Sequence, residues 1–399
     1  MASEASWKPL RQHHQSNLSL PSGSYIYNLC PTGGNAVAAI SSDNSLRCFD
    51  RQTLTLLPNG VFEDIHPGVT CLSEITGASG ESLLATAGRD GTVKLWDLRG
   101  GKNAAAAMTF TTDKNAPVTA LAACTASHTI VAGTELVSSQ AEVLFWDIRS
   151  PGQTRLSYVE SHNDDVTELQ FHPSRSTVLL SGSTDGLVNI YDTTITDEDD
   201  ALLQVIKHSS IHCAGFLGDN AVYALSHDET FAIHPLNSPD ENVVEPAAIQ
   251  FGDVRPILHS DYVVQVLFGG GGTYIASGKT SGHQLDLTPL VSSPKFHFDQ
   301  SNIWRLPGAH GQEVVRSVYL DDQSKSIFTC GEDGYVRLWK LDGDDENAAQ
   351  ADSTGVTSST LASAKSTAPG EEHGATPSAL KKHRHKDKKR HKDHRYKPY

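Results

Sequence analysis

The feature that most constrains this chain is a short pattern that recurs along it. Residues 83–99 read LLATAGRDGTVKLWDLR: an apolar run, an Asp-Gly turn, and an alternation of apolar and polar residues that ends in Trp, Asp and Arg. A tight Asp-Gly turn between two such runs is typical of a β-hairpin. The same ingredients return at residues 179–192 and 327–340. The recurrence predicts a repeat protein whose units bury their apolar faces against one another.

These three stretches resemble the WD40-repeat family, and the resemblance implies a β-propeller of four-stranded blades. It says less about biochemical function, because proteins that share this fold have many different functions. Degenerate copies of the hairpin, in which some of the characteristic residues are replaced, occupy the rest of the chain up to about residue 340. Successive turn positions lie 43 to 53 residues apart. The chain is therefore predicted to be all-β: a closed seven-bladed WD40 β-propeller with a disordered basic C-terminal tail. The seven turn positions are Asp43, Asp90, Gln140, Asp185, Asp228, Ser281 and Asp333.

This register also predicts the borders of the regions. The last repeat ends near Leu341 with three strands of its own, and an open blade would leave a sheet edge unpaired. We therefore expect residues 13–20 to add the outer strand of the last blade and close the ring. The predicted regions are a flexible N-terminus (1–12), the propeller (13–341), a disordered linker that is acidic and rich in Ser, Thr and Ala (342–380), and a basic tail (381–399).

The tail makes the charge of the chain strongly uneven. It holds ten Lys or Arg against two Asp, a net +8, which leaves −23 for the remaining residues because the whole chain carries −15. A dense basic run is typical of a nuclear-import signal, and it can also contact RNA or keep a protein soluble. We expect an import receptor to bind the tail and to bring the protein to the nucleus, including the nucleolus, with any RNA contact made through the tail only. Its basic residues are Lys381, Lys382, Arg384, Lys386, Lys388, Lys389, Arg390, Lys392, Arg395 and Lys397.

Other features argue against several classes of protein. The N-terminus has no apolar run, and no eighteen uncharged apolar residues occur in succession, so neither a secretion signal nor a membrane span is expected. The six cysteines are scattered without a Cys-x-x-Cys pair, which argues against disulfides and structural zinc and fits a reducing compartment. We expect no metal, no cofactor, no membrane contact, and a monomeric propeller.

A hydroxyl residue, a His and an Asp recur together with an aromatic residue, and such a combination can serve nucleophilic hydrolysis. The family resemblance implies a structural role instead, in which Asp accepts from the turn and from His, His bonds the hydroxyl, and the hydroxyl reaches the Trp N–H. The combination occurs three times, whereas an active site occurs once, so no catalytic residue is assigned. The three sets are His66, Thr86, Asp90 and Trp96; His162, Ser181, Asp185 and Tyr191; and His310, Thr329, Asp333 and Trp339.

The family resemblance also indicates which face binds a partner. Members usually dock peptides on the face that carries the turns between the second and third strands of each blade. The register places there a mixture that is net acidic and contains two arginines, which suits a basic peptide with some carboxylate or carbonyl contact. The candidates are Arg89, Asp164, Asp165, Thr184, Glu313, Arg316 and Glu332, with Thr70 and Thr167 just inside them.

Two functions stay open at this point. The acidic body favours a non-catalytic scaffold that serves as a chaperone or assembly factor for a basic client, such as a ribosomal protein or a histone. The alternative is a substrate receptor of a cullin-type ubiquitin ligase, because residues 96–99 and 146–149 resemble the Trp-Asp-x-Arg box of such receptors. Arg99 and Arg149 would then contact the ligase adaptor; otherwise each is an exposed residue at the end of a strand.

Overall fold

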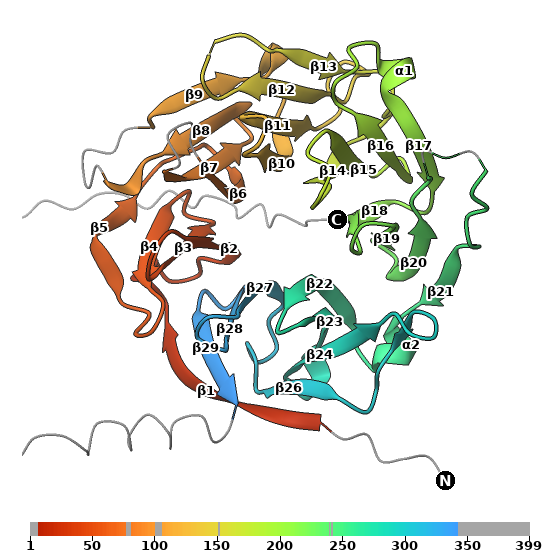
Figure 1. Cartoon of the computed structure of the whole chain (residues 1–399). Coiled ribbons are helices and arrows are strands. Elements are labelled where there is room, and N and C mark those ends of the chain that lie inside the picture. Colours follow the sequence, from red (N-terminus) through yellow and green to blue (C-terminus); the bar gives the residue numbers. More distant parts are fainter. Residues whose placement is uncertain are drawn as a thin grey trace, which may run out of the picture. The chain divides into compact units, whose positions relative to one another are not determined.

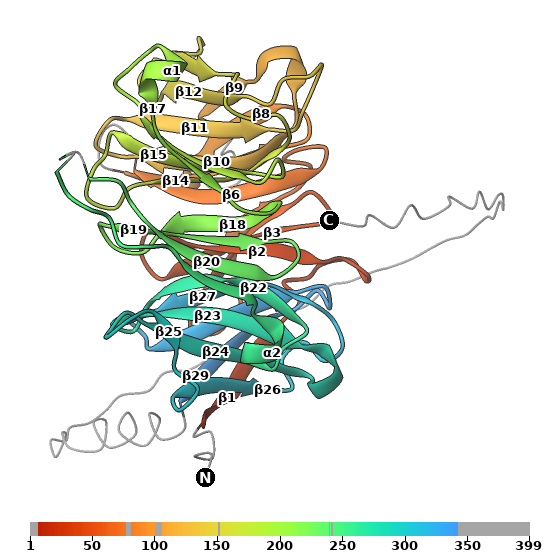
Figure 2. The same cartoon turned by 90° about the vertical axis from the view of Figure 1, so that its right-hand side faces the viewer.

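The blades follow one another around a ring, as Figure 1 shows for the computed structural model of the chain. Each blade is an antiparallel sheet whose first strand lies nearest the axis and whose last strand lies at the rim (Figures 1 and 2). The structure describes residues 7–76, 81–99, 106–150, 152–238, 240 and 242–341. The predicted linker and basic tail, residues 342–399, lie outside the described residues.

Five blades are separate four-stranded sheets. The first contains β2 (Ile26–Thr32), β3 (Ala36–Ser41), β4 (Leu46–Asp50) and β5 (Leu56–Phe62). The second contains β6 (Val69–Thr76), β7 (Ser82–Gly88), β8 (Thr92–Trp96) and β9 (Met108–Thr111). The third contains β10 (Val118–Cys124), β11 (Thr129–Thr134), β12 (Val143–Asp147) and β13 (Leu156–Tyr158). The fourth contains β14 (Val166–Phe171), β15 (Val178–Ser183), β16 (Leu187–Asp192) and β17 (Leu202–Lys207). The fifth contains β18 (Ile211–Phe216), β19 (Ala221–Ser226), β20 (Thr230–Pro235) and β21 (Ile249–Asp253).

The last two blades share one nine-stranded sheet. The sixth blade contains β22 (Tyr262–Gly269), β23 (Gly272–Lys279), β24 (Gln284–Val291), β25 (His297–Phe298) and β26 (Ile303–Pro307). The seventh contains β27 (Val315–Asp321), β28 (Ser326–Gly331), β29 (Val336–Leu341) and β1 (Trp7–Ser16). The predicted all-β, seven-bladed propeller is confirmed.

Helical segments are short connections between strands. They are α1 (Glu198–Ala201), α2 (Arg255–Leu258) and 3-10 turns at Asp113–Asn115 and Thr280–Gly282. No helix in the described part of the chain is long and apolar enough to span a bilayer.

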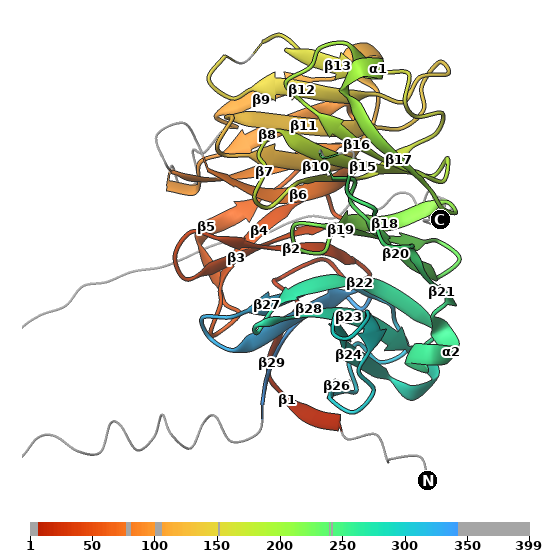
Figure 3. The same ribbon diagram turned by 45° about the vertical axis from the view of Figure 1, so that its right-hand side comes forward.

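The strand β1 closes the ring by pairing with two blades at once (Figure 3). From Leu10 onward it runs antiparallel to β29, with Leu10 opposite Leu341, while residues 7–9 run parallel to β26. The predicted boundary was wrong, because residues 7–12 belong to this strand and not to a flexible N-terminus. Burial explains the difference: Leu10 is 2% exposed and packs in the apolar cluster between the sixth and seventh blades.

Apolar clusters fill the spaces between neighbouring blades, and the described residues form seven of them around the ring. Each cluster combines strands of two blades, as where the ring of Trp146 in the third blade lies 5.7 Å from that of Phe110 in the second. Leu18 and Leu20, which follow β1, belong to the cluster between the seventh and first blades. The stability of the ring is therefore approximately a sum of contacts between neighbouring blades.

The Asp-Gly turns depend on glycine. Gly91, Gly186 and Gly334 have φ angles of +70°, +87° and +75°, a region in which other residues are strained. The third blade lacks such a turn, and residues 135–142 form a longer loop that contains an isolated bridge between Val137 and Gln140. This loop lies at the same end of its blade as the Asp-Gly turns, so it adds side chains to that face.

We expect Leu10→Ala to lower the free energy of unfolding by about 2–5 kcal/mol, because the substitution removes a buried side chain at the point of ring closure. The matched control is His14→Ala, which alters an exposed side chain of the same strand and should change the stability by less than about 0.5 kcal/mol. Urea denaturation of the two variants measures both values. Equal losses would contradict the role of β1 as the closing strand.

Candidate partner-binding face

The upper face of the propeller, the end at which the inner strands begin, is shaped by a bulge that every blade repeats. Near the start of each inner strand the pairing register shifts, which leaves one residue unpaired and re-aims its side chain. Because all inner strands begin at the same end of the ring, these side chains encircle the axis there. The bulged residues are Tyr27, Thr70, Thr119, Thr167, His212, Val264 and Arg316. The sequence register had found three of them, Thr70, Thr167 and Arg316.

Three of the bulged residues are threonines that join neighbouring blades. Each threonine Oγ1 donates to the carbonyl of the first residue in the next inner strand, over 2.6 to 2.8 Å. These hydroxyls are committed to the framework, so Thr70 and Thr167 stabilise the ring rather than offer free groups to a partner. The pairs are Thr70 with Val118, Thr119 with Val166, and Thr167 with Ile211.

Both arginines predicted to face a partner are neutralised on the upper face itself. Arg316 Nε donates to Glu332 Oε1 at 2.9 Å, and Nη2 of the same guanidinium contacts the same oxygen. Arg89 Nη2 lies 3.4 Å from Glu135 Oε1, in the long loop of the third blade. A partner's carboxylate would have to displace a resident one, so the predicted carboxylate contact is disfavoured.

Other predicted residues keep carboxylates that no cation neutralises. Asp164, Asp165 and Glu313 form no ion pair among the described residues. Backbone N–H groups hold two of them in place: Leu136 N donates to Asp165 Oδ1 at 2.7 Å, and Asp165 N donates to Asp164 Oδ1 at 2.9 Å. Thr184 N donates to the carbonyl of Asp165 at 3.0 Å. The face is therefore net negative.

Sequence reasoning missed a histidine pair in the fifth blade. The rings of His212 and His227 stack with centroids 5.4 Å apart, one at the bulge and one just before the turn residue Asp228. Burial, together with His227 and the charge of Arg316, lowers the pKa of His212 to about 4, so this ring is neutral near pH 7. The sequence register had located the turn at Asp228, but it assigned face residues only in the three blades that keep the full motif, and the fifth blade has lost the aromatic residue of that motif.

The recurring hydroxyl, His and Asp residues form chains of hydrogen bonds within the blades. In the second blade His66 Nδ1 lies 3.0 Å from Asp90 Oδ1, and His66 Nε2 lies 2.8 Å from Thr86 Oγ1. Trp96 Nε1 donates to the same Thr86 oxygen at 2.8 Å. The seventh blade repeats the chain at 2.8, 2.8 and 3.0 Å, in the pairs His310 with Asp333, His310 with Thr329, and Trp339 with Thr329.

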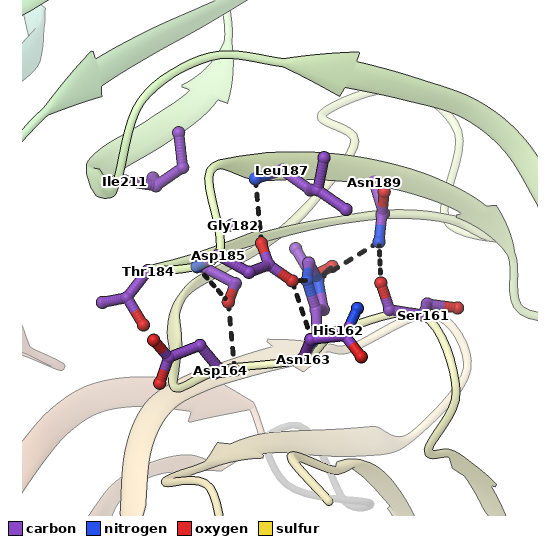
Figure 4. Close-up of polar contacts among 12 residues, drawn as sticks. Ser161, His162, Asn163, Asp164, Gly182, Thr184, Asp185, Leu187, Asn189 and Ile211 are labelled. Atoms are coloured by element: carbon purple, nitrogen blue, oxygen red, sulfur yellow. Dashed lines mark hydrogen bonds and ion pairs between the residues drawn. The ribbon is translucent and has the colours of Figure 1, made fainter.

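The fourth blade shows how the Asp closes the turn (Figure 4). Asp185 Oδ2 lies 3.0 Å from His162 Nδ1, and its Oδ1 accepts from Leu187 N at 2.9 Å. Burial alone would raise the pKa of Asp185, but the hydrogen bonds and the charge of His162 hold it below its usual range. His162 Nε2 lies 2.6 Å from Ser181 Oγ, and the Tyr191 hydroxyl lies 3.4 Å from that oxygen in the place of Trp.

This geometry is structural rather than catalytic. The hydroxyls of Thr86, Ser181 and Thr329 belong to fully buried residues and lie between two polar neighbours. A nucleophile must reach its substrate, and these oxygens do not reach the surface. Within the described ranges no group of three or more His, Cys, Asp or Glu side chains is placed to hold a metal ion.

Arg99 and Arg149 fold back onto the Asp of their own Trp-Asp pair. Arg99 Nε and Nη2 donate to Asp97 Oδ1 and Oδ2 at 2.8 and 2.6 Å, and Arg99 N donates to Asp97 Oδ1 at 3.0 Å. The same contacts recur between Arg149 and Asp147. Arg255 makes the same contacts with Asp253, although no Trp precedes that Asp. Asp-x-Arg is therefore a local turn in this protein, and the turn explains the positions of Arg99 and Arg149 without a ligase adaptor.

The closed ring, the repeated bulge and the buried His-hydroxyl chains define a class, the WD40-repeat propellers. The family described as "WD domain, G-beta repeat" matches residues 60–97, 153–192 and 300–340. An uncharacterized WD repeat-containing protein of Schizosaccharomyces pombe is 30% identical over 328 residues, which cover 79% of this chain and 95% of that protein. This chain therefore belongs to the WD40-repeat family, whose members generally act as protein-interaction scaffolds and are typically non-catalytic.

Two further relatives and one solved structure extend the comparison. An uncharacterized WD repeat-containing protein of Saccharomyces cerevisiae is 42% identical over 252 residues, or 62% of this chain and 61% of the yeast protein, so the match spans less than two thirds of that relative. A Dictyostelium discoideum homolog of WD repeat-containing protein 89 is 26% identical, covering 79% of this chain and 82% of that protein. The β-propeller domain of Cps50 (Swd1) from Myceliophteria thermophila shares the fold, with a TM-score of 0.62 at 18% identity over 84% of this chain and 100% of that one.

We expect Asp333→Asn to lower the free energy of unfolding by about 1–3 kcal/mol near pH 7, because it leaves the buried His310 and the half-buried Arg337 without their carboxylate. Burial alone would raise the pKa of Asp333, but His310 and Arg337 hold it below its usual range. Since the pKa is lower in the folded than in the unfolded state, this stabilisation is present above about pH 4 and is lost as the pH falls through the folded-state pKa. Urea denaturation from pH 7 to pH 3 measures it.

The matched control is Asp228→Asn, at the same turn position of the fifth blade. Asp228 accepts a hydrogen bond of 3.4 Å from Ser209 and has no ion pair in the described part of the chain. Its substitution should change the stability by less than about 0.5 kcal/mol. A difference between wild type and Asp333→Asn that widened toward acid pH would contradict the assignment.

Proposed function

We propose that this protein is a nuclear scaffold that captures a basic client protein on its upper face and serves as a chaperone or assembly factor for it. The observation that carries the proposal is the set of carboxylates of Asp164, Asp165 and Glu313, which have no ion-pair partner among the described residues. The arginines of the same face are already paired with Glu135 and Glu332. A cationic segment therefore finds charge complementarity there, and an anionic one does not.

The charge of the rest of the chain supports the same client. Residues 1–380 carry −23 against +8 in the tail. A field of this sign speeds the encounter with a cationic protein and competes with its unwanted binding to nucleic acid. Ribosomal proteins and histones are the client class that this chemistry fits, and RNA would be contacted through the basic tail alone because the acidic body repels phosphate.

We expect the recovery of basic proteins with the purified chain to fall severalfold when Asp164→Asn, Asp165→Asn and Glu313→Gln are combined, because these changes remove charge and leave an amide oxygen that still accepts the backbone hydrogen bonds. The measurement is affinity purification followed by quantitative mass spectrometry at low and at moderate salt. The matched control combines Asp199→Asn, Asp219→Asn and Asp240→Asn, which remove three exposed carboxylates from connections at the opposite end of the blades. Equal recovery with both triple variants would contradict the proposal.

A ligase receptor is the competing outcome of the same purification. The exposed fractions of the Arg99 and Arg149 side chains are 71% and 55%, and exposed ion pairs of this kind are weak. Recovery of a cullin adaptor that disappears with Arg99→Ala and Arg149→Ala would replace the chaperone function by the receptor function. Loss of basic clients at moderate salt, with no effect of the arginine pair, supports the chaperone.

The nuclear location is a separate prediction that depends on the tail. We expect a fluorescent fusion that lacks residues 381–399 to move to the cytosol, because ten cations in one run are the feature an import receptor would bind. The control deletes 19 residues of the linker instead, 352–370, and should stay nuclear. An unchanged nuclear signal without the tail would refute the assignment of the import function to it.

A further inference from the structure

The lower face of the propeller, opposite the upper face, carries two adjoining cavities. The first has a volume of about 430 Å³ and lies between the sixth and seventh blades, where β1 enters the ring. The second has a volume of about 370 Å³ and lies between the seventh and first blades. Leu320, Asp321 and Asp322 line both cavities. The two cavities are adjoining parts of one region of the surface, here called the base groove.

The first cavity is an apolar site that the fold leaves partly open. Its walls include Leu10, Trp304, Leu320 and Leu341, which pack against the cluster between the two blades, and the last three keep part of their surface exposed. The turn at its rim contains Gly270 and Gly271, with φ angles of +59° and +77°. A residue other than glycine would be strained at either position. Because glycine has no side chain, nothing at these two positions covers the rim of the cavity.

The second cavity contains buried polar atoms that lack partners. The Arg51 side chain is 8% exposed, and its Nη1 donates to Asp321 and Gln323 at 3.2 Å each. Arg51 Nε and the hydroxyl of Thr32, a residue that is 6% exposed, have no hydrogen-bond partner among the described residues. Buried polar groups of this kind are normally satisfied. Both atoms are inaccessible to solvent, so a bound segment reaches them only if the side chains that line the cavity shift.

The charges around the base groove favour a cation. Outside the Arg51–Asp321 pair, the exposed carboxylates of Glu74 and Asp322 line the second cavity and the exposed ammonium group of Lys325 lines the first, and none of the three forms an ion pair in the described ranges. The unpaired charge of the groove is therefore net negative, and both carboxylates lie in the second cavity. Asp322 Oδ1 accepts from Gly270 N, which leaves its second oxygen for a partner. Tyr319, whose ring stacks on Phe328, lines the same cavity. A Lys or Arg side chain thus finds two carboxylates beside the apolar cavity.

We propose that the base groove binds an extended segment of a partner protein in which a large apolar side chain is closely followed by Lys or Arg. The apolar side chain fills the cavity between Trp304 and Leu341, and the cation lies at Asp322 and Glu74. This site is at the opposite end of the blades from the upper face, so the two faces can hold different partners at the same time.

The test is a selection from phage that display random twelve-residue peptides, with the full-length chain as the immobilised target. The expected result is an enriched pool that shares an apolar residue closely followed by Lys or Arg. Failure to enrich such a pool would overturn the proposal. So would a dimer of the free chain in light scattering that Leu320→Glu converts to a monomer, because a second copy would then be the occupant of the groove.

A selected peptide, labelled with fluorescein, is then titrated with variants of the full chain. Leu320→Glu should weaken its binding at least tenfold, and Asp322→Asn about three- to tenfold with a flatter dependence on salt. Asp322→Asn keeps an oxygen for Gly270 N, so it stays informative if Leu320→Glu does not fold. The control Asp219→Asn alters an exposed carboxylate in the corresponding turn of the fifth blade and should leave binding unchanged. Binding that survives both groove variants and is lost in the upper-face triple variant would overturn this site and leave the client-binding proposal standing.

Discussion

The pairing of β1 with β29 and β26 is the interaction on which the rest of the structure depends. Each blade buries its apolar surface only against its two neighbours. The ring therefore has as many interfaces as blades, and no central core stabilises it in addition. The seventh blade takes its outer strand from the start of the chain, and Leu10, Leu18 and Leu20 bring apolar surface into the two interfaces on either side of it. Closure therefore joins the two ends of the propeller sequence in one sheet.

Closure also positions the upper face and the base groove. The inner strands are held parallel to one another around the axis, so a bulge that each strand repeats becomes a ring of side chains at one end. At the other end the turns of adjacent blades meet, and the base groove forms where β1 inserts beside the turn at Gly270. At the upper end, residues that resemble the triad of a hydrolase hold the Asp-Gly turns in place: Asp185 accepts a hydrogen bond across its turn and contacts His162, while Ser181 stays buried.

Charge pairing separates the residues that build the faces from those that are available to a partner. Arg89 and Arg316 have the chemistry to bind a carboxylate, but Glu135 and Glu332 already occupy them. The carboxylates of Asp164 and Asp165 are held by backbone N–H groups, which fix their direction without cancelling their charge. A face of mixed composition thus has a net preference for cations, which its residue list alone does not reveal.

The sequence by itself determined the seven blades, because apolar alternation and Asp-Gly turns are local patterns that repeat along the chain. It also determined the hydrogen-bonded sets of His66, His162 and His310, whose spacing is fixed within one blade. Only the tertiary structure decided where β1 begins, since Leu10 is buried by strands that lie about 300 residues away in sequence. It also decided which charges pair, and it brought together Trp304, Asp322 and Arg51 from three blades. Contacts between blades depend on how the ring closes, and no local pattern encodes that closure.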